Sequence, residues 1–221
     1  MVRREPLETE QVQRVQQAAW EAALRDSGLP VAGLDGGDGR PRFALAAPLS
    51  PAMLGEAELA DVWLTSRQPA WVVREALGAG MPEGSRLIDL YDVWLGEAAL
   101  PGRVVASVYR ATLEGDGVTA SAPALEAAAS ALLAARTLPR ERPRGDRTVL
   151  YDLRPFVGGV ELRSLGAAVD VRMELRHDPE KGVGRPEEVL AELADRSGTS
   201  LDGAVVVRER LVLAPERRER R

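Results

Sequence analysis

The fold is decided between Tyr151 and Leu213, where residues 169–176 are Val-Asp-Val-Arg-Met-Glu-Leu-Arg. Apolar and charged residues alternate along this segment, which is the pattern of a β-strand with one buried face. Further on comes Arg185-Pro186-Glu187-Glu188-Val189-Leu190, where a proline and two acids in the first turn predict the start of a helix. With strands also expected over residues 148–153, 160–165 and 204–213, the stretch predicts strand, hairpin, strand, helix, strand.

Similar patterns precede this stretch. Residues 121–135 carry the clearest helical stripe in the chain, and residues 104–113 before them predict a strand. In the first half, a short arm over residues 2–7 leads to a helix that begins at Thr9 and stops near Gly28. The elements expected after it are paired strands over 42–49 and 58–65, a helix opened by Pro69 and closed by Gly78 and Gly80, and a long strand over 86–95.

Each half therefore has the order strand, helix, strand, strand, helix, strand. This order predicts an α+β fold made of tandem ferredoxin-like (βαββαβ) units with antiparallel sheets. The first unit is expected over residues 1–99 and the second over residues 100–214, with a charged tail at 215–221. The pattern leaves open whether the two sheets lie side by side or face to face.

Composition narrows the possible functions. The 221 residues include no cysteine, which excludes a disulfide framework, a thiolate zinc site and a cysteine-ligated iron–sulfur cluster. The net charge of −5 argues against binding of nucleic acid by the whole surface of the protein, although it is compatible with a local basic patch. No apolar run follows Arg3 and Arg4, and no window is long enough to span a membrane, so we expect a cytoplasmic protein.

The single histidine, His177, lies in the sequence Arg-His-Asp-Pro-Glu-Lys-Gly, which predicts a turn. A histidine beside an acid has a pKa suited to a general base, but no second histidine, cysteine or catalytic motif accompanies it. We therefore expect His177 to be a solvated turn residue, and we predict no catalytic residue, no metal site and no cofactor. The glycine-rich run over residues 33–39 precedes a strand rather than a helix, and we expect it to be a flexible connection.

Arginines are the candidates for binding. Residues 136–147 hold five arginines against two acids, a composition that suits either phosphate contacts or a charged sheet edge that resists aggregation. Both interpretations stay open. The residues that we predict to bind phosphate or carboxylate groups through charge-assisted hydrogen bonds are Arg40, Arg42, Arg140, Arg142, Arg144, Arg154, Arg185 and Arg208.

Several short segments of the sequence are similar to segments that occur together in a known family. They are the end of the first helix over residues 23–30, Met81-Pro82-Glu83-Gly84, Asp152-Leu153-Arg154-Pro155, residues 185–190 and Arg208. In this order they resemble the radical SAM-linked family, also called domain of unknown function 2344, over nearly the full chain. The resemblance implies a bacterial accessory domain that is encoded beside, or fused to, a radical SAM protein.

Two stretches depart from that family. Its members usually carry Ser-His-Leu-Asp at the start of the first helix and Gly-Phe-Asn-Pro-His-Pro in the loop after it. This chain has Val12-Gln13-Arg14-Val15 and Gly36-Gly37-Asp38-Gly39-Arg40-Pro41 in those places. Any chemistry that depends on the family's histidines is therefore lost, and the absence of cysteines means that this chain is not itself the radical SAM enzyme.

Three hypotheses follow. The first is a non-catalytic binding module that docks a radical SAM protein and presents RNA or another substrate to it. The alternative is a metal-independent RNA-binding or RNA-processing protein of the tandem ferredoxin-like type, in which His177 and nearby arginines act on a phosphodiester; this rests on analogy between folds. The third is a scaffold that does not contact nucleic acid. The substrate and the oligomeric state stay open.

Overall fold

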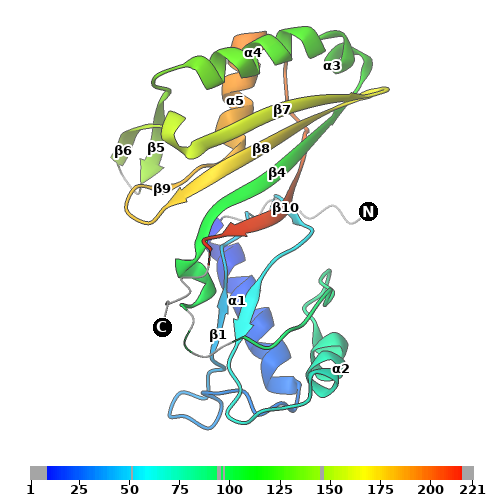
Figure 1. The fold of residues 1–221 in the computed structure, drawn as a ribbon, viewed down its shortest axis with the longest axis vertical. Helices are drawn as coiled ribbons and strands as arrows, with labels where there is room; N and C mark the ends of the chain where they lie inside the picture. The colour runs from blue at the N-terminus through cyan, green and yellow to red at the C-terminus, as the bar shows by residue number, and fades with distance from the viewer. Residues whose placement is uncertain (1–8, 51, 94–95, 97, 145–146, 216–221) are drawn as a thin grey trace. The chain divides into compact units, whose positions relative to one another are not determined.

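A computed structural model describes residues 9–50, 52–93, 96, 98–144 and 147–215. The chain divides into two units, Met1–Ala52 with Ala57–Arg103, and Met53–Glu56 with Val104–Arg221. Each unit has its own apolar core. The helices and strands of both units are drawn in Figure 1. The fold is mixed α+β, as expected. No helix in the described part of the chain is both long and apolar enough to cross a lipid bilayer.

In the described part of the first unit the α-helices are α1 (Thr9–Asp26) and α2 (Ala70–Gly80), and the short strands are β1 (Phe43–Leu45) and β3 (Ala60–Val62). The predicted pairing of the two strands is confirmed, because β1 and β3 run antiparallel with Phe43 opposite Val62. Both helices contribute to the core, which consists of Leu24, Leu29, Val31, Val73 and Leu77.

The predicted strand over residues 86–95 is wrong for its described part, since residues 86–93 form no strand. Leu87 and Leu90 pack against the core, whereas Ile88 and Tyr91 are exposed. This spacing of three residues does not match the two-residue period of a strand. Within the described residues of the first unit, the strands are β1 and β3, so tandem ferredoxin-like units are not confirmed. The predicted arm over residues 2–7 and most of the predicted tail lie outside the described residues.

The second unit is larger. Its main sheet has the strand order β2-β10-β4-β8-β7, with β9 paired to the end of β8. The neighbours β10, β4, β8 and β7 are antiparallel, and β2 is parallel to β10. In chain order the elements are β2 (Leu54–Gly55), β4 (Val104–Glu114), α3 (Asp116–Ala120), α4 (Ala122–Ala134), β5 (Pro139–Arg144), β6 (Arg147–Asp152), η2 (Arg154–Phe156), β7 (Val157–Leu165), β8 (Ala168–Asp178), β9 (Gly182–Val183), α5 (Pro186–Ser197) and β10 (Val205–Leu213).

The alternating segment is the centre of this sheet. Val169, Val171, Met173 and Leu175 of β8 have no exposed surface, which confirms the predicted buried face. The last three of these residues belong to the core that α4 and α5 cover, together with Leu125, Leu132 and Leu193 from the helices. Because each buried aliphatic side chain contributes roughly 1.5–3 kcal/mol, this face is a main source of the unit's stability.

The arginine-rich segment forms a strand of its own. The strand predicted over residues 148–153 is confirmed as β6, and β5 pairs with it antiparallel, with Pro139 opposite Asp152 and Pro143 opposite Thr148. In the described chain, β5 pairs only with β6. A strand with one unpaired edge tolerates proline, because the missing N–H can face away from its neighbour.

Candidate functional site

Three polar side chains lie on the core side of the second unit's sheet. Ser107 of β4 pairs opposite Leu175, and Arg208 of β10 pairs opposite Tyr109, so both point to the side that the helices cover. His177 follows Leu175 by two residues on β8 and shares that side. The Oγ atom of Ser107 lies 2.8 Å from Nε2 of His177. Ser107 and Arg208 are both almost completely buried.

The surroundings of His177 keep its ring uncharged. Burial lowers the pKa of His177 to about 4, and the positive charge of Arg208 acts in the same direction. A neutral imidazole that shares a hydrogen bond with a serine hydroxyl is the arrangement of a general base and a nucleophile. Ser107, however, has no exposed surface, so a substrate does not reach its hydroxyl in this conformation. The pair therefore acts as an internal polar contact here.

The prediction that His177 is a solvated turn residue is wrong. His177 is half-buried within β8, which extends to Asp178. The signal was present in the sequence, because His177 continues the alternation of Val171, Met173 and Leu175. The predicted strand ends at Arg176, two residues before the end of β8. No comparable signal marks Ser107, a small polar residue within β4.

The opposite side of the sheet carries a chain of alternating charges. Arg110 donates to Glu56 (2.7 Å) and to Glu209 (3.0 Å), and Arg172 donates to the second oxygen of Glu209 (2.9 Å). Burial alone would raise the pKa of Glu209, but the hydrogen bonds from Arg172 and Arg110 outweigh it and lower that pKa. The register of β10 shifts between Arg208 and Arg210, and such a bulge re-aims side chains. The network links β4, β8 and β10 with Glu56, the residue that follows β2.

The segment Asp152-Leu153-Arg154-Pro155, which carries part of the family resemblance, joins neighbouring segments through hydrogen bonds that we call the Asp152–Arg154 clasp. Oδ1 of Asp152 accepts hydrogen bonds from the backbone N–H groups of Leu138 (2.7 Å) and Arg154 (3.0 Å). The guanidinium of Arg154 donates to the carbonyls of Leu133 (2.8 Å), Ala135 (3.1 Å) and Val157 (2.9 Å). Two of these carbonyls lie at the C-terminal end of α4, where the helix itself offers no donors. Arg154 thus caps α4 and ties it to β7.

Arg140 is tied to helix α5. Its guanidinium pairs with the carboxylate of Glu192, and its Nη1 lies 3.6 Å from Oδ2 of Asp195. Glu192 also accepts a hydrogen bond of 2.5 Å from Arg196. Arg142 and Arg144 follow on β5, and their side chains lie outside the described part of the structure.

The remaining predicted arginines have different surroundings. In the first unit, Arg42 is exposed and its guanidinium lies 4.7 Å from the ring centre of Trp63, a cation–π contact. Arg40 is also exposed, and its backbone N–H donates to Asp38 (3.3 Å). Arg185 is exposed at the N-cap of α5. In the second unit, Arg140, Arg154, Arg185 and Arg208 thus occupy distinct environments rather than one common patch.

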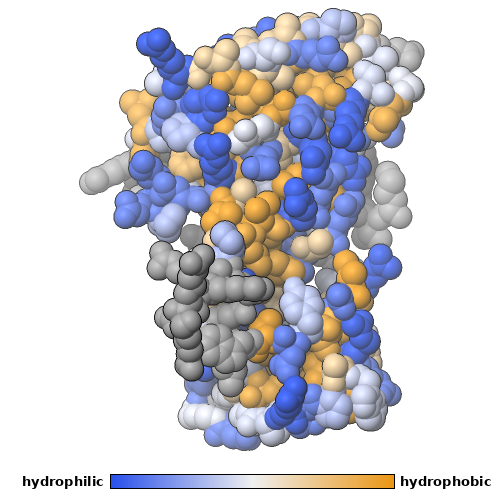
Figure 2. All heavy atoms as spheres, in the orientation of Figure 1, coloured by the Kyte–Doolittle hydropathy of each residue, from blue (hydrophilic) through white to orange (hydrophobic). Residues whose placement is uncertain are grey.

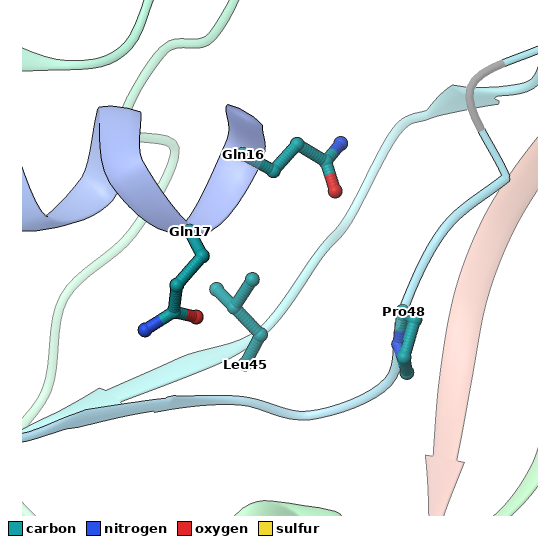
Figure 3. A pocket seen from close by; sticks show the side chains of 4 residues that line it. All are labelled: Gln16, Gln17, Leu45 and Pro48. Carbon is teal, nitrogen blue, oxygen red and sulfur yellow. The ribbon is translucent and has the colours of Figure 1, made fainter. Parts of the chain in front are cut away.

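A shallow hollow of about 220 Å³ lies in the first unit (Figure 3). Gln16 and Gln17 of α1 line it on one side, and Leu45 and Pro48 line it on the other. These side chains offer amide hydrogen bonds and apolar contact but no charge. Among the described residues, no group of three or more histidine, cysteine or acidic side chains is arranged to hold a metal ion.

Comparison with known proteins gives one family. The family described as "Uncharacterized protein conserved in bacteria (DUF2344)" matches residues 15–186. The match includes Asp152, Arg154 and both members of the Ser107–His177 pair, and it ends before Arg208. No curated protein matches the chain closely enough to count as a relative.

Proposed function

Because the chain belongs to the DUF2344 family of bacterial proteins, we propose that it is a non-catalytic accessory protein that binds a radical SAM enzyme. The identity of the partner rests on the resemblance of the sequence to radical SAM-linked proteins. The non-catalytic role rests on how the structure uses the residues that carry this resemblance.

The observation that carries the proposal is the clasp at Asp152 and Arg154. The carboxylate accepts two backbone hydrogen bonds and the guanidinium donates three, and all five join segments of the second unit to one another. These groups build the fold rather than face a substrate. If the residues that carry the family resemblance stabilise the fold, the protein's function is binding through its surface rather than catalysis by these residues.

For the second unit we propose the ferredoxin-like fold. Its support is the chain order β4, α4, β7, β8, α5, β10, which is strand, helix, strand, strand, helix, strand, together with the sheet order β10-β4-β8-β7. The β5–β6 hairpin is then an insertion before the second strand of that fold. We propose no such arrangement for the first unit.

RNA processing is the second candidate function. It is favoured by one observation, the convergence of His177, Ser107 and Arg208 on the core side of the sheet. A reaction there requires an open conformation, because Ser107 and Arg208 are buried in the structure described. This candidate predicts that His177→Ala abolishes an RNA-cleaving activity of the purified protein.

Affinity capture separates the two candidates. The tagged chain is recovered from its native cells with and without ribonuclease treatment, and the bound proteins and RNA are both identified. We expect a radical SAM protein to be recovered whether or not ribonuclease is added. Recovery of RNA without that protein favours the second candidate, and recovery of neither contradicts both.

A further inference from the structure

The first unit exposes a group of large apolar side chains on one stretch of its surface. Trp71 of α2 is 70% exposed, and Ile88 and Tyr91 of the following segment are 60% and 66% exposed. Val93 continues this group, which we call the aromatic strip. Scattered apolar residues are normal on a protein surface, but several large exposed ones on two segments that are held together, tryptophan and tyrosine among them, are a candidate interaction site.

Two ion pairs align the parts of the strip. Arg67, just before α2, lies 3.2 Å from Asp92, and Arg74, one turn into α2, lies 3.0 Å from Asp89. A further hydrogen bond of 3.5 Å joins Arg74 to the carbonyl of Ile88. These contacts hold the start of α2, which carries Trp71, against residues 88–92.

Packing beneath the strip fixes which side chains face outward. Val73 and Leu77 turn one side of α2 to the core, and Trp71 lies on the opposite side of the helix by the 3.6-residue period. Leu87 and Leu90 pack against the same core, which leaves Ile88 and Tyr91 outside. Figure 2 shows hydrophobic residues reaching the surface of this unit between hydrophilic ones.

The strip has the composition of a protein interface. Its centre is aromatic and aliphatic, and its rim consists of exposed arginines and aspartates. Protein interfaces combine an apolar centre with a polar rim, and tryptophan, tyrosine and arginine are the residues that most often dominate their binding energy.

Charge favours a protein over a nucleic acid as the occupant. The first unit holds 10 arginines against 14 carboxylates, and the two arginines of the strip are each paired with an aspartate. Hydrogen bonds from the backbone of Leu90 and from Arg74 lower the pKa of Asp89, so that aspartate is charged at neutral pH. Glu75 adds a further carboxylate beside Arg74. Phosphate groups bind unpaired cations, whereas Arg67 and Arg74 are each already paired with an aspartate.

We infer that the aromatic strip is the surface that docks the radical SAM enzyme, and that the enzyme meets it with an apolar surface edged by lysine or arginine. This inference rests on the proposed function and adds the docking surface and the chemistry of the partner. Opposite charges at the rim orient the two proteins and speed their association, and the aromatic side chains hold the complex.

The test uses the full chain and a purified radical SAM protein from the same cells, with affinity measured by isothermal titration calorimetry. The double variant Trp71→Ala/Tyr91→Ala removes the centre of the strip. Because both side chains are exposed, the variant retains its fold, which circular dichroism checks. Leu165→Ala, an exposed apolar residue of β7, is the matched control. Glu75→Lys tests the charge of the rim.

We expect the double variant to bind at least about 30-fold more weakly, the effect of losing one strong interface residue. Leu165→Ala should bind like the unaltered chain, and Glu75→Lys should bind more weakly with a reduced salt dependence. Equal binding by the double variant and the unaltered chain overturns the strip as the docking surface and leaves the proposed function standing. No binding by the unaltered chain overturns both, and a dimer that the double variant disrupts would assign the strip to a second copy of the chain.

Discussion

The hydroxyl of Ser107 and the imidazole of His177 share a hydrogen bond of 2.8 Å, although the two residues are 70 positions apart in the sequence. The bond joins β4 to the end of β8 on the core side of the sheet. In Ser107→Ala, Nε2 of His177 loses this partner in a half-buried place. We expect the free energy of unfolding to fall by about 1–3 kcal/mol, measured by urea unfolding. Ser164→Ala, at an exposed position of β7, is the control, and equal midpoints for the two variants would contradict the prediction.

The pH dependence of stability follows from the same histidine. Its pKa is about 4 in the folded protein and 6.5 in the unfolded chain, so between these values only the unfolded chain takes up the proton. The free energy of unfolding should therefore fall as pH is lowered from about 6.5 toward 4, by at most about 1.4 kcal/mol per pH unit. The partial exposure of His177 makes the slope smaller.

Urea unfolding at pH 7, 6 and 5 measures this slope. The pKa values of Asp89, Asp178 and Glu209 are lowered by the fold, so their contributions are lost only as pH falls below the unfolded values near 4. His177→Asn should flatten the curve between pH 7 and 5. A variant that keeps the full slope would show that another group causes it.

Arg154 should matter for stability rather than for binding. In Arg154→Ala, the carbonyls of Leu133, Ala135 and Val157 lose their donor, and we expect a loss of about 2–3 kcal/mol. Arg154→Lys should recover only part of this loss, because an ammonium group cannot reproduce the planar fork of a guanidinium. The exposed Arg136→Ala is the control and should change stability by less than about 0.5 kcal/mol. Thermal unfolding that is unchanged in Arg154→Ala would refute the capping role.

The ion pairs of Arg140 should differ in strength. Glu192 keeps Arg196 as a partner when Arg140 is removed, so we expect Arg140→Ala to cost only about 1 kcal/mol. Double-mutant cycles with Glu192→Gln and Asp195→Asn compare the two partners. The coupling energy should be measurable for Glu192 and near zero for Asp195. The side chain of Asp195 is largely exposed, and its Oδ2 lies 3.6 Å from Nη1 of Arg140. The reverse order would mean that the Glu192 contact is not the stabilising one.

The sequence predicted the second unit better than the first, for a physical reason. The strands of the second unit are long, and the alternation from Val169 to Leu175 and the helical stripe around Leu125 both continue over many residues. In the first unit, β1 and β3 are short, and the apolar residues from Leu87 to Tyr91 pack with a period of three. Because pattern analysis looks for the period of a regular helix or strand, it assigned this irregular segment to a strand.

The candidate site was harder to predict than the fold. Arg154 and Arg140 are recognisable in the sequence only as cations, and their acceptors are backbone carbonyls and acids from distant segments. The contact of Ser107 with His177 depends on the register of β4 against β8, which one sequence does not contain. The aromatic strip was missed because Trp71, Ile88 and Tyr91 look like core residues until the packing of Leu87 and Leu90 is known.

The most direct test of the central claim is a titration of a purified radical SAM protein from the same cells into the purified chain, after ribonuclease treatment of both. The account predicts a saturable binding heat that persists in His177→Ala, because the proposed function is binding and not catalysis. The absence of a binding heat for the unaltered chain, together with RNA cleavage that His177→Ala abolishes, would contradict it.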